Sequence, residues 1–219
     1  GGFVSGSDNV AMGSQAGLGT LGNRLVINRA ISMGSSAKAS TDDSIAIGSS
    51  SVASGKTSLA LGLGAEATGT NSISIGNGNK VSGNNSGAIG DPSIINGANS
   101  YSVGNTNTIA AGATDAFVLG NNVNIGAYSN VVALGSNSNV TVNGGVALGS
   151  SSVASTDSFT NDPTRTGYVP PPADAAQKAR IIATNSTLAA VSVGDAANNK
   201  FRQITGVAAG TADSDAVNV

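Results

Sequence analysis

The sequence predicts an all-β fold in which a short parallel unit repeats as a solenoid. Three observations support this prediction: a glycine at fixed spacing, an aliphatic tripeptide before each glycine, and a composition poor in bulky side chains. The glycines that recur every 14 residues are Gly34, Gly48, Gly62, Gly76, Gly90 and Gly104, and the series continues with small insertions through Gly120, Gly135 and Gly149. A fixed period of this kind indicates a repeat architecture more strongly than any local motif does.

Each repeat is expected to form one coil made of two short strands. The first strand precedes the periodic glycine, as in Ser44-Ile45-Ala46-Ile47-Gly48. The second strand is marked by a column of residues five positions after each glycine: Ala39, Ala53, Ala67, Val81, Ile95, Ile109, Ile125, Val140 and Ala154. Two strands of about five residues and two tight turns together account for about 14 residues.

The alternation within the first strand predicts which side chains share a face, because successive side chains of a strand point to opposite sides. We expect the large aliphatic residues to face the second column inside the coil: Ile45, Ile47, Leu59, Leu61, Ile73 and Ile75. The small residues Ala46, Ala60 and Ser74 are then expected on the opposite, outer side, together with the stacked serines at 44, 58, 72, 86 and 100.

The composition suits a long, thin object better than a globular one. The chain has 219 residues and 31 glycines, but aromatic residues make up only 3% of it. Stacked coils are one way to bury surface without bulky groups. Association of identical chains through the small-residue face is a second, and a monomer with that face in solvent is the alternative.

Three regions are expected along the chain. Residues 1–154 carry the coils, residues 155–190 form an insertion, and residues 191–219 form a last strand and a terminal element. The insertion contains an extended, proline-stiffened stretch with Pro170-Pro171-Pro172, followed by a short helix from Asp174 to Ala183 in which Asp174 is the capping residue. The ends of the chain suggest a segment excised from a longer protein.

The residue types present argue against most reactive sites. The net charge is −2, there is no cysteine or histidine, and Glu66 is the only glutamate. Catalytic triads, cysteine–histidine pairs and histidine or thiolate metal sites are thereby excluded. The basic residues are scattered, so neither a nucleic-acid partner nor direct membrane contact is expected. We therefore expect no enzyme activity, no cofactor and no metal site.

The repeat resembles that of a known family. The pattern Asn-Ser-aliphatic-small-aliphatic-Gly, as in Asn71-Ser72-Ile73-Ser74-Ile75-Gly76, resembles the head repeat of the YadA-like trimeric autotransporter adhesins. The segment from Phe201 to Val219 is similar to the neck that joins head to stalk in this family. Two such signatures in the family's order make the resemblance specific.

The resemblance implies a homotrimer of left-handed parallel β-rolls followed by a neck. Such a head is displayed at the cell surface on a stalk, anchored in the outer membrane by a barrel that this segment lacks. The neck is expected to bring polar and apolar residues into contact between chains. These neck residues are Arg202, Gln203, Ile204, Asp213, Asp215 and Val217.

The function expected from the resemblance is adhesion to host extracellular matrix such as collagen, to cells or to abiotic surfaces. A structural spacer in a longer fibre, whose adhesive tip lies elsewhere, is the alternative. A polysaccharide-active or acyl-transferring β-helix is a third class, but the known acyltransferase helices have 18-residue coils and a catalytic histidine. The sequence does not assign the ligand-binding residues. The candidates are the turn residues Asp91, Asn105, Asn121 and Asn137 and the stretch 165–172. The alternative is that these residues are turns in contact with solvent and bind no ligand.

Overall fold

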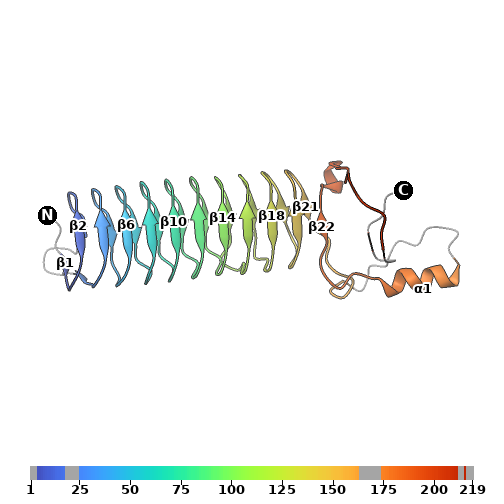
Figure 1. Cartoon of the computed structure of the whole chain (residues 1–219), viewed down its shortest axis with the longest axis horizontal. Coiled ribbons are helices and arrows are strands. Elements are labelled where there is room, and N and C mark those ends of the chain that lie inside the picture. The colour runs from blue at the N-terminus through green and yellow to red at the C-terminus, as the bar shows by residue number, and fades with distance from the viewer. Residues whose placement is uncertain (1–3, 18–24, 163–173, 212–214, 216–219) are drawn as a thin grey trace.

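A computed structural model describes residues 4–17, 25–162, 174–211 and 215. The chain winds into a straight parallel β-solenoid whose coils follow one another along the long axis of the molecule (Figure 1). Each regular coil contributes a three-residue strand and a two-residue strand. The prediction of an all-β parallel solenoid with 14-residue coils is thus confirmed.

Ten three-residue strands and one final two-residue strand form one continuous sheet, which we call the long-strand sheet. Neighbouring coils pair in parallel, for example Ile45 with Leu59 and Leu59 with Ile73. The eleven strands in order are β2 (Val10–Met12), β4 (Ile31–Met33), β6 (Ile45–Ile47), β8 (Leu59–Leu61), β10 (Ile73–Ile75), β12 (Gly87–Ile89), β14 (Tyr101–Val103), β16 (Phe117–Leu119), β18 (Val132–Leu134), β20 (Val146–Leu148) and β22 (Val191–Ser192).

The other two-residue strands form the opposite wall, which we call the short-strand sheet. Seven of them pair in one run: β5 (Lys38–Ala39), β7 (Val52–Ala53), β9 (Glu66–Ala67), β11 (Lys80–Val81), β13 (Ile94–Ile95), β15 (Thr108–Ile109) and β17 (Asn124–Ile125). Two further pairs are β19 (Asn139–Val140) with β21 (Val153–Ala154), and β1 (Val4–Ser5) with β3 (Leu25–Val26).

The prediction of which side chains of the first strand point into the coil is wrong. The small middle residues Ala46, Ala60 and Ser74 are fully buried inside the coil, where the second column faces them. The large residues at the first and third positions, such as Ile45 and Leu61, point outward and are half-buried or exposed. The interior between the two sheets is filled by small residues of one strand against Ala, Val or Ile of the other, so a second large aliphatic layer has no room.

The buried serines satisfy their hydroxyls on turn carbonyls. Ser58 Oγ donates to Gly55 O at 2.6 Å, and Ser72 Oγ donates to Gly69 O at 2.6 Å. These serines share a face with the small residues, as predicted, but that face is the inner one. A buried hydroxyl without a partner would be destabilising, which explains the regular placement of serine at the turn.

The periodic glycines are required by close approach between coils. Gly48 has a φ of +127°, and a Cβ built on it would lie 2.3 Å from the carbonyl oxygen of Gly62 in the next coil. A side chain at this position would therefore push neighbouring coils apart, in addition to the strain of the backbone conformation.

The repeat is interrupted after β21. Helix α1 (Ala175–Ala183) has Asp174 as its N-cap, with Asp174 Oδ1 accepting from the backbone N–H of Gln177 at 2.8 Å. The helix lies beyond the C-terminal end of the coils, and none of its residues is buried (Figure 1). The chain then returns to add β22 beside β20, and a short 3₁₀ helix follows at Ala196–Asn198.

Candidate association surface and terminal segment

The outward side chains of the long-strand sheet form a continuous apolar surface, which we call the outer apolar face. It consists of the first and third residues of each strand, and no charged residue occurs at these positions from β2 to β22. Leu119 is 49% exposed on it, and Leu148 is 46% exposed. Ten strand spacings of about 4.8 Å give this face a length of roughly 48 Å.

A face of this size indicates an interaction surface. Soluble monomers rarely leave a contiguous apolar area of this extent in water. The aliphatic columns were therefore correctly identified from the sequence but assigned to the wrong side. The signal that identifies them as an interface is the absence of charge at two positions of every strand, combined with a coil too thin to bury them.

The opposite wall has a different chemistry. The outward residues of the short-strand sheet include Lys38, Glu66, Lys80 and Asn124. Lys80 Nζ lies 2.9 Å from Glu66 Oε1 in the neighbouring coil, and both side chains are partly exposed. Charge and mixed polarity on this wall are consistent with a surface in contact with solvent.

The turn residues proposed as ligand contacts serve the fold. Asn105 Oδ1 accepts from the backbone N–H of Asp91 at 2.8 Å, and Asn121 Oδ1 accepts from that of Asn105 at 2.8 Å. The carboxylate of Asp91 in turn accepts from the backbone N–H of Asn77. Asn137 Oδ1 accepts from Asn122 Nδ2 at 2.6 Å. The stretch 165–172 lies outside the described residues.

A second ladder of side chains follows the other turn. Asn71 Nδ2 donates to Asn85 Oδ1 at 3.0 Å, and Asn85 Nδ2 donates to Asn99 Oδ1 at 3.2 Å. These asparagines adopt positive φ, a conformation that asparagine tolerates better than most residues. Stacked asparagines therefore hold successive turns in register, as in other parallel stacks of identical residues.

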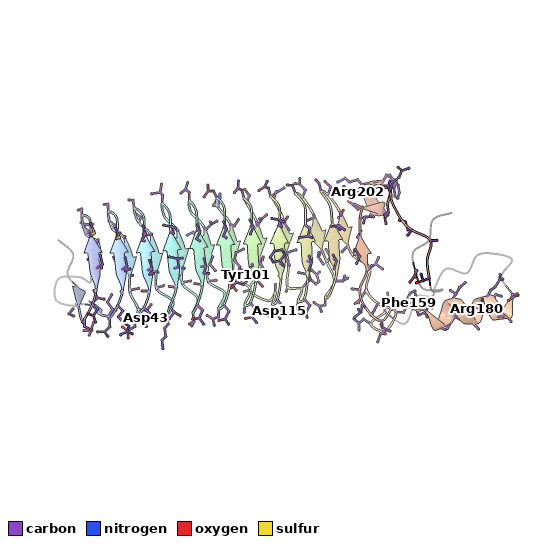
Figure 2. The ribbon with its side chains drawn as sticks, in the orientation of Figure 1. Asp43, Tyr101, Asp115, Phe159, Arg180 and Arg202 are labelled. Carbon is purple, nitrogen blue, oxygen red and sulfur yellow. The ribbon has the colours of Figure 1, made fainter. Side chains whose placement is uncertain are left out.

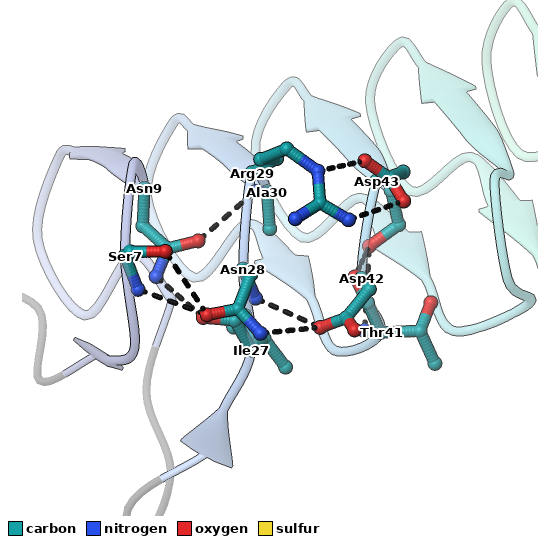
Figure 3. A network of polar contacts seen from close by, with 10 residues as sticks. Ser7, Asn9, Ile27, Asn28, Arg29, Ala30, Thr41, Asp42 and Asp43 are labelled. Atoms are coloured by element: carbon teal, nitrogen blue, oxygen red, sulfur yellow. Dashed lines mark hydrogen bonds and ion pairs between the residues drawn. The ribbon is translucent and has the colours of Figure 1, made fainter.

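The N-terminal coils contain a charged network (Figure 3). Arg29 Nε donates to Asp43 Oδ1 at 2.6 Å, and Nη2 donates to Asp43 Oδ2 at 2.8 Å. Hydrogen bonding to Arg29, together with its charge, lowers the pKa of Asp43, and the same pairing raises the pKa of Arg29. Asp42 Oδ1 accepts from the backbone N–H of Asn28 at 2.8 Å, so this network ties two coils together.

Arg202 lies against the last coil, at the C-terminal end of the solenoid (Figure 2). Its Nη1 donates to Ser152 Oγ at 3.0 Å and Leu148 O at 3.3 Å, and also to Val193 O. Its Nη2 donates to Ser150 O at 3.1 Å. In the regular repeat, backbone N–H groups of the next coil donate to the equivalent carbonyls, as Gly48 N–H donates to Met33 O. The guanidinium thus supplies donors in place of those N–H groups, and it satisfies acceptors at the end of the solenoid.

The other predicted neck residues are less constrained in the single chain. Gln203 and Ile204 are exposed. Asp215 Oδ2 accepts from the backbone N–H of Thr211 at 2.7 Å. Asp213 and Val217 lie outside the described residues, and contact between chains at any of the six positions stays a prediction.

The described ranges hold no group of three or more histidine, cysteine, aspartate or glutamate side chains that could bind a metal ion. Among the same residues, no helix is long and apolar enough to cross a membrane. What the geometry offers is a long repetitive surface with one apolar side and one polar side. The described residues thus form an elongated scaffold with two chemically different sides.

Comparison with known proteins finds a known repeat in part of the chain. Five segments match the YadA head domain repeat: 28–51, 42–65, 53–79, 67–91 and 132–152. A stretch of 53 residues, 24% of the chain, is 58% identical to the trimeric autotransporter adhesin AtaA of Acinetobacter sp. strain Tol 5. The match spans 2% of the length of that relative.

The fold agrees with that of a solved structure. The crystal structure of the collagen-binding domain of the Yersinia adhesin YadA superimposes with a TM-score of 0.53 at 23% identity, covering 97% of this chain and 93% of that one. The chain therefore shares the fold of this adhesin domain, and part of it matches the YadA head domain repeat.

Proposed function

We propose that the chain acts as a homotrimeric head at the bacterial cell surface, attached through a stalk to an outer-membrane anchor, and that it binds host extracellular matrix such as collagen. The observation that carries the trimer is the charge-free outer apolar face, which three parallel rolls would bury against one another. The polar short-strand sheet and the turns would then form the outside. The collagen-binding Yersinia domain supports the choice of collagen as first ligand to test.

The proposal divides the chain into three parts. Residues 1–154 form the head, residues 155–190 form a head insertion, and residues 191–219 form the last strand and the neck. In the trimer, Arg202, Gln203, Ile204, Asp213, Asp215 and Val217 would contact neighbouring chains. The position of Arg202 at the end of the last coil supports a role for it where head passes into neck.

Binding would arise from many equivalent weak contacts along the roll. Each coil presents nearly the same turn ladders, and three chains triple every contact, so that avidity replaces a single strong site. A structural spacer is the second candidate. It is favoured by the small share of the matched relative that this chain spans, since a longer fibre can carry its adhesive tip elsewhere.

The test uses the 219-residue chain with a trimeric coiled coil fused after Val219. Its mass is measured by light scattering, and its attachment is measured on collagen, on albumin and on bare plastic. We expect a trimer that attaches to collagen more than to albumin. A stable monomer, with the mass of one 21.0 kDa chain plus one copy of the fused segment, contradicts the assembly. A trimer that attaches to none of the three surfaces favours the spacer.

A nested series of coil deletions then tests the distributed contacts. Removing residues 63–76 joins Gly62 to Asn77 and keeps the repeat in phase, shortening the roll by about 4.8 Å. Attachment should weaken gradually as further coils are deleted. Full binding until one particular coil is lost, and none afterwards, would instead locate a discrete site.

A further inference from the structure

One column of the outer apolar face departs from the regular repeat. It consists of the first residue of each long strand, and neighbouring members pair directly across the sheet. From β6 to β18 its members are Ile45, Leu59, Ile73, Gly87, Tyr101, Phe117 and Val132. Aliphatic residues of similar size thus give way to a glycine, then to two aromatic residues, and then to valine.

The glycine and the first aromatic residue fit together. A Cβ built on Gly87 would lie 2.8 Å from both Cδ1 and Cε1 of Tyr101, so the ring of Tyr101 lies over the Gly87 backbone. Gly87 is buried although its strand position faces outward. An aromatic ring that covers a glycine in the adjacent strand is a recognised way to stabilise a sheet position without a side chain. Figure 2 shows Tyr101 midway along the solenoid.

The two rings nevertheless leave much of their surface uncovered. Tyr101 is 43% exposed and Phe117 is 45% exposed. They lie within the charge-free face, between Gly87 and Val132 of the same column. The two rings therefore form a bulky projection on an otherwise even surface, and we call this projection the aromatic step.

This projection matters because an interface between repeating units allows several nearly equivalent alignments, each shifted by a whole coil. If two copies of the face pack with their axes parallel, a shift by one coil, about 4.8 Å, replaces Ile45 by Leu59 and changes little in the contact. Register is weakly specified wherever neighbouring units present equivalent side chains. At the aromatic step, the same shift would place Tyr101 at the layer of Gly87 or of Phe117, where the volumes no longer match.

We propose that Gly87, Tyr101 and Phe117 set the axial register in which copies of this chain associate through the outer apolar face. The inference rests on the proposed trimer and adds a residue-level determinant of its alignment. The occupant of the face at this layer is the same layer of a second copy, because only identical layers bring identical volumes together.

The test exploits the absence of cysteine in the chain. Leu61→Cys and Ile75→Cys place one thiol in each of two adjacent coils on the outer apolar face, where Ile75 pairs with Leu61. Chains carrying tags of different size are co-expressed and oxidised, and disulfide-linked dimers are separated by mass. The ratio of hybrid dimers (61 to 75) to same-layer dimers (61 to 61) reports slippage by one coil.

The test variant makes the column uniformly aliphatic by three substitutions, Gly87→Ile, Tyr101→Ile and Phe117→Ile. With the Tyr101 ring removed, the next atom near a Cβ at position 87 is Ile73 O at 3.6 Å, an ordinary contact, so the variant is expected to fold. Its far-UV circular dichroism spectrum checks this. We expect the hybrid ratio to rise several-fold over that of the chain with the native column.

An unchanged ratio, with same-layer dimers present in both proteins, overturns the register proposal and leaves the trimer standing. Abundant hybrid dimers with the native column overturn it as well. Absence of all disulfide-linked dimers, together with a monomeric mass, means that the outer apolar face does not join copies, and then the proposed trimer fails too. If the triple isoleucine variant is misfolded, Gly87→Ala alone takes its place. This substitution moves only the Tyr101 ring and is expected to raise the hybrid ratio to a smaller extent.

Discussion

Adjacent isoleucines in β13 offer a sharp test of where the core lies. Ile95 is 0% exposed between the two sheets, whereas Ile94, next to it in the same strand, is 43% exposed on the polar wall. Truncation of Ile95 to alanine removes three carbon atoms, a transfer loss of roughly 2.4 kcal/mol at about 0.8 kcal/mol per methylene. The cavity left behind raises the expected loss to roughly 3–4 kcal/mol. Ile94→Ala should cost about 1 kcal/mol or less.

The assay is urea unfolding followed by far-UV circular dichroism, with Ile94→Ala as the matched control. Both changes delete the same atoms from the same strand, and neither lies on the outer apolar face, so association affects them equally. Equal losses of unfolding free energy in the two variants, or a larger loss for Ile94→Ala, would refute the inward placement of the second column.

The remaining predictions concern the inner face, the first charged pair and the end cap. Ala60→Arg should abolish folding or lower the melting temperature strongly, because the side chain would enter a fully buried position, whereas Lys56→Ala in a turn should change stability by about 0.5 kcal/mol at most; similar melting temperatures would contradict this. Asp43→Asn should lower the unfolding midpoint slightly at pH 7, because the lowered pKa of Asp43 means that its pairing with Arg29 stabilises the fold above the ordinary aspartate pKa of about 3.9. This contribution is lost as pH falls through the folded pKa, so the difference between the two proteins should shrink in acid. A difference that is the same at every pH would speak against the pair. Arg202→Met should speed hydrogen exchange in the last coil while leaving the middle coils unchanged, and uniform protection in both would argue against a capping role.

The period, the two strands per coil and the short helix could be predicted from the sequence because each has a local cause. The strand before Gly48 and the column at Ala53 repeat at fixed spacing, and Asp174 provides the cap of α1. These features depend only on neighbouring residues. Their prediction required no knowledge of what the coil packs against.

The rule that large apolar residues are buried could not predict which side of the first strand lies inside the coil. That rule assumes that one chain buries its own core, and here the single coil is too thin to do so. Ala60 fits between the sheets, while Leu61 lies outside on the face that we propose another copy of the chain covers. The contacts of Arg202 with the last coil were equally inaccessible, because they join residues about 50 positions apart that only the completed solenoid brings together.

Three kinds of position in each coil are therefore constrained for different reasons. Glycines such as Gly48 are fixed by the approach of the next coil, and inner residues such as Ala60 are fixed by the narrow interior. The outer apolar face is constrained by the association that we propose. The outward column of the short-strand sheet has no such constraint, and it changes freely from Lys38 through Glu66 to Asn124. If binding to matrix differs among heads with this fold, the differences should be encoded in this column and in the turns that flank it, since a change elsewhere disturbs the fold or the assembly first.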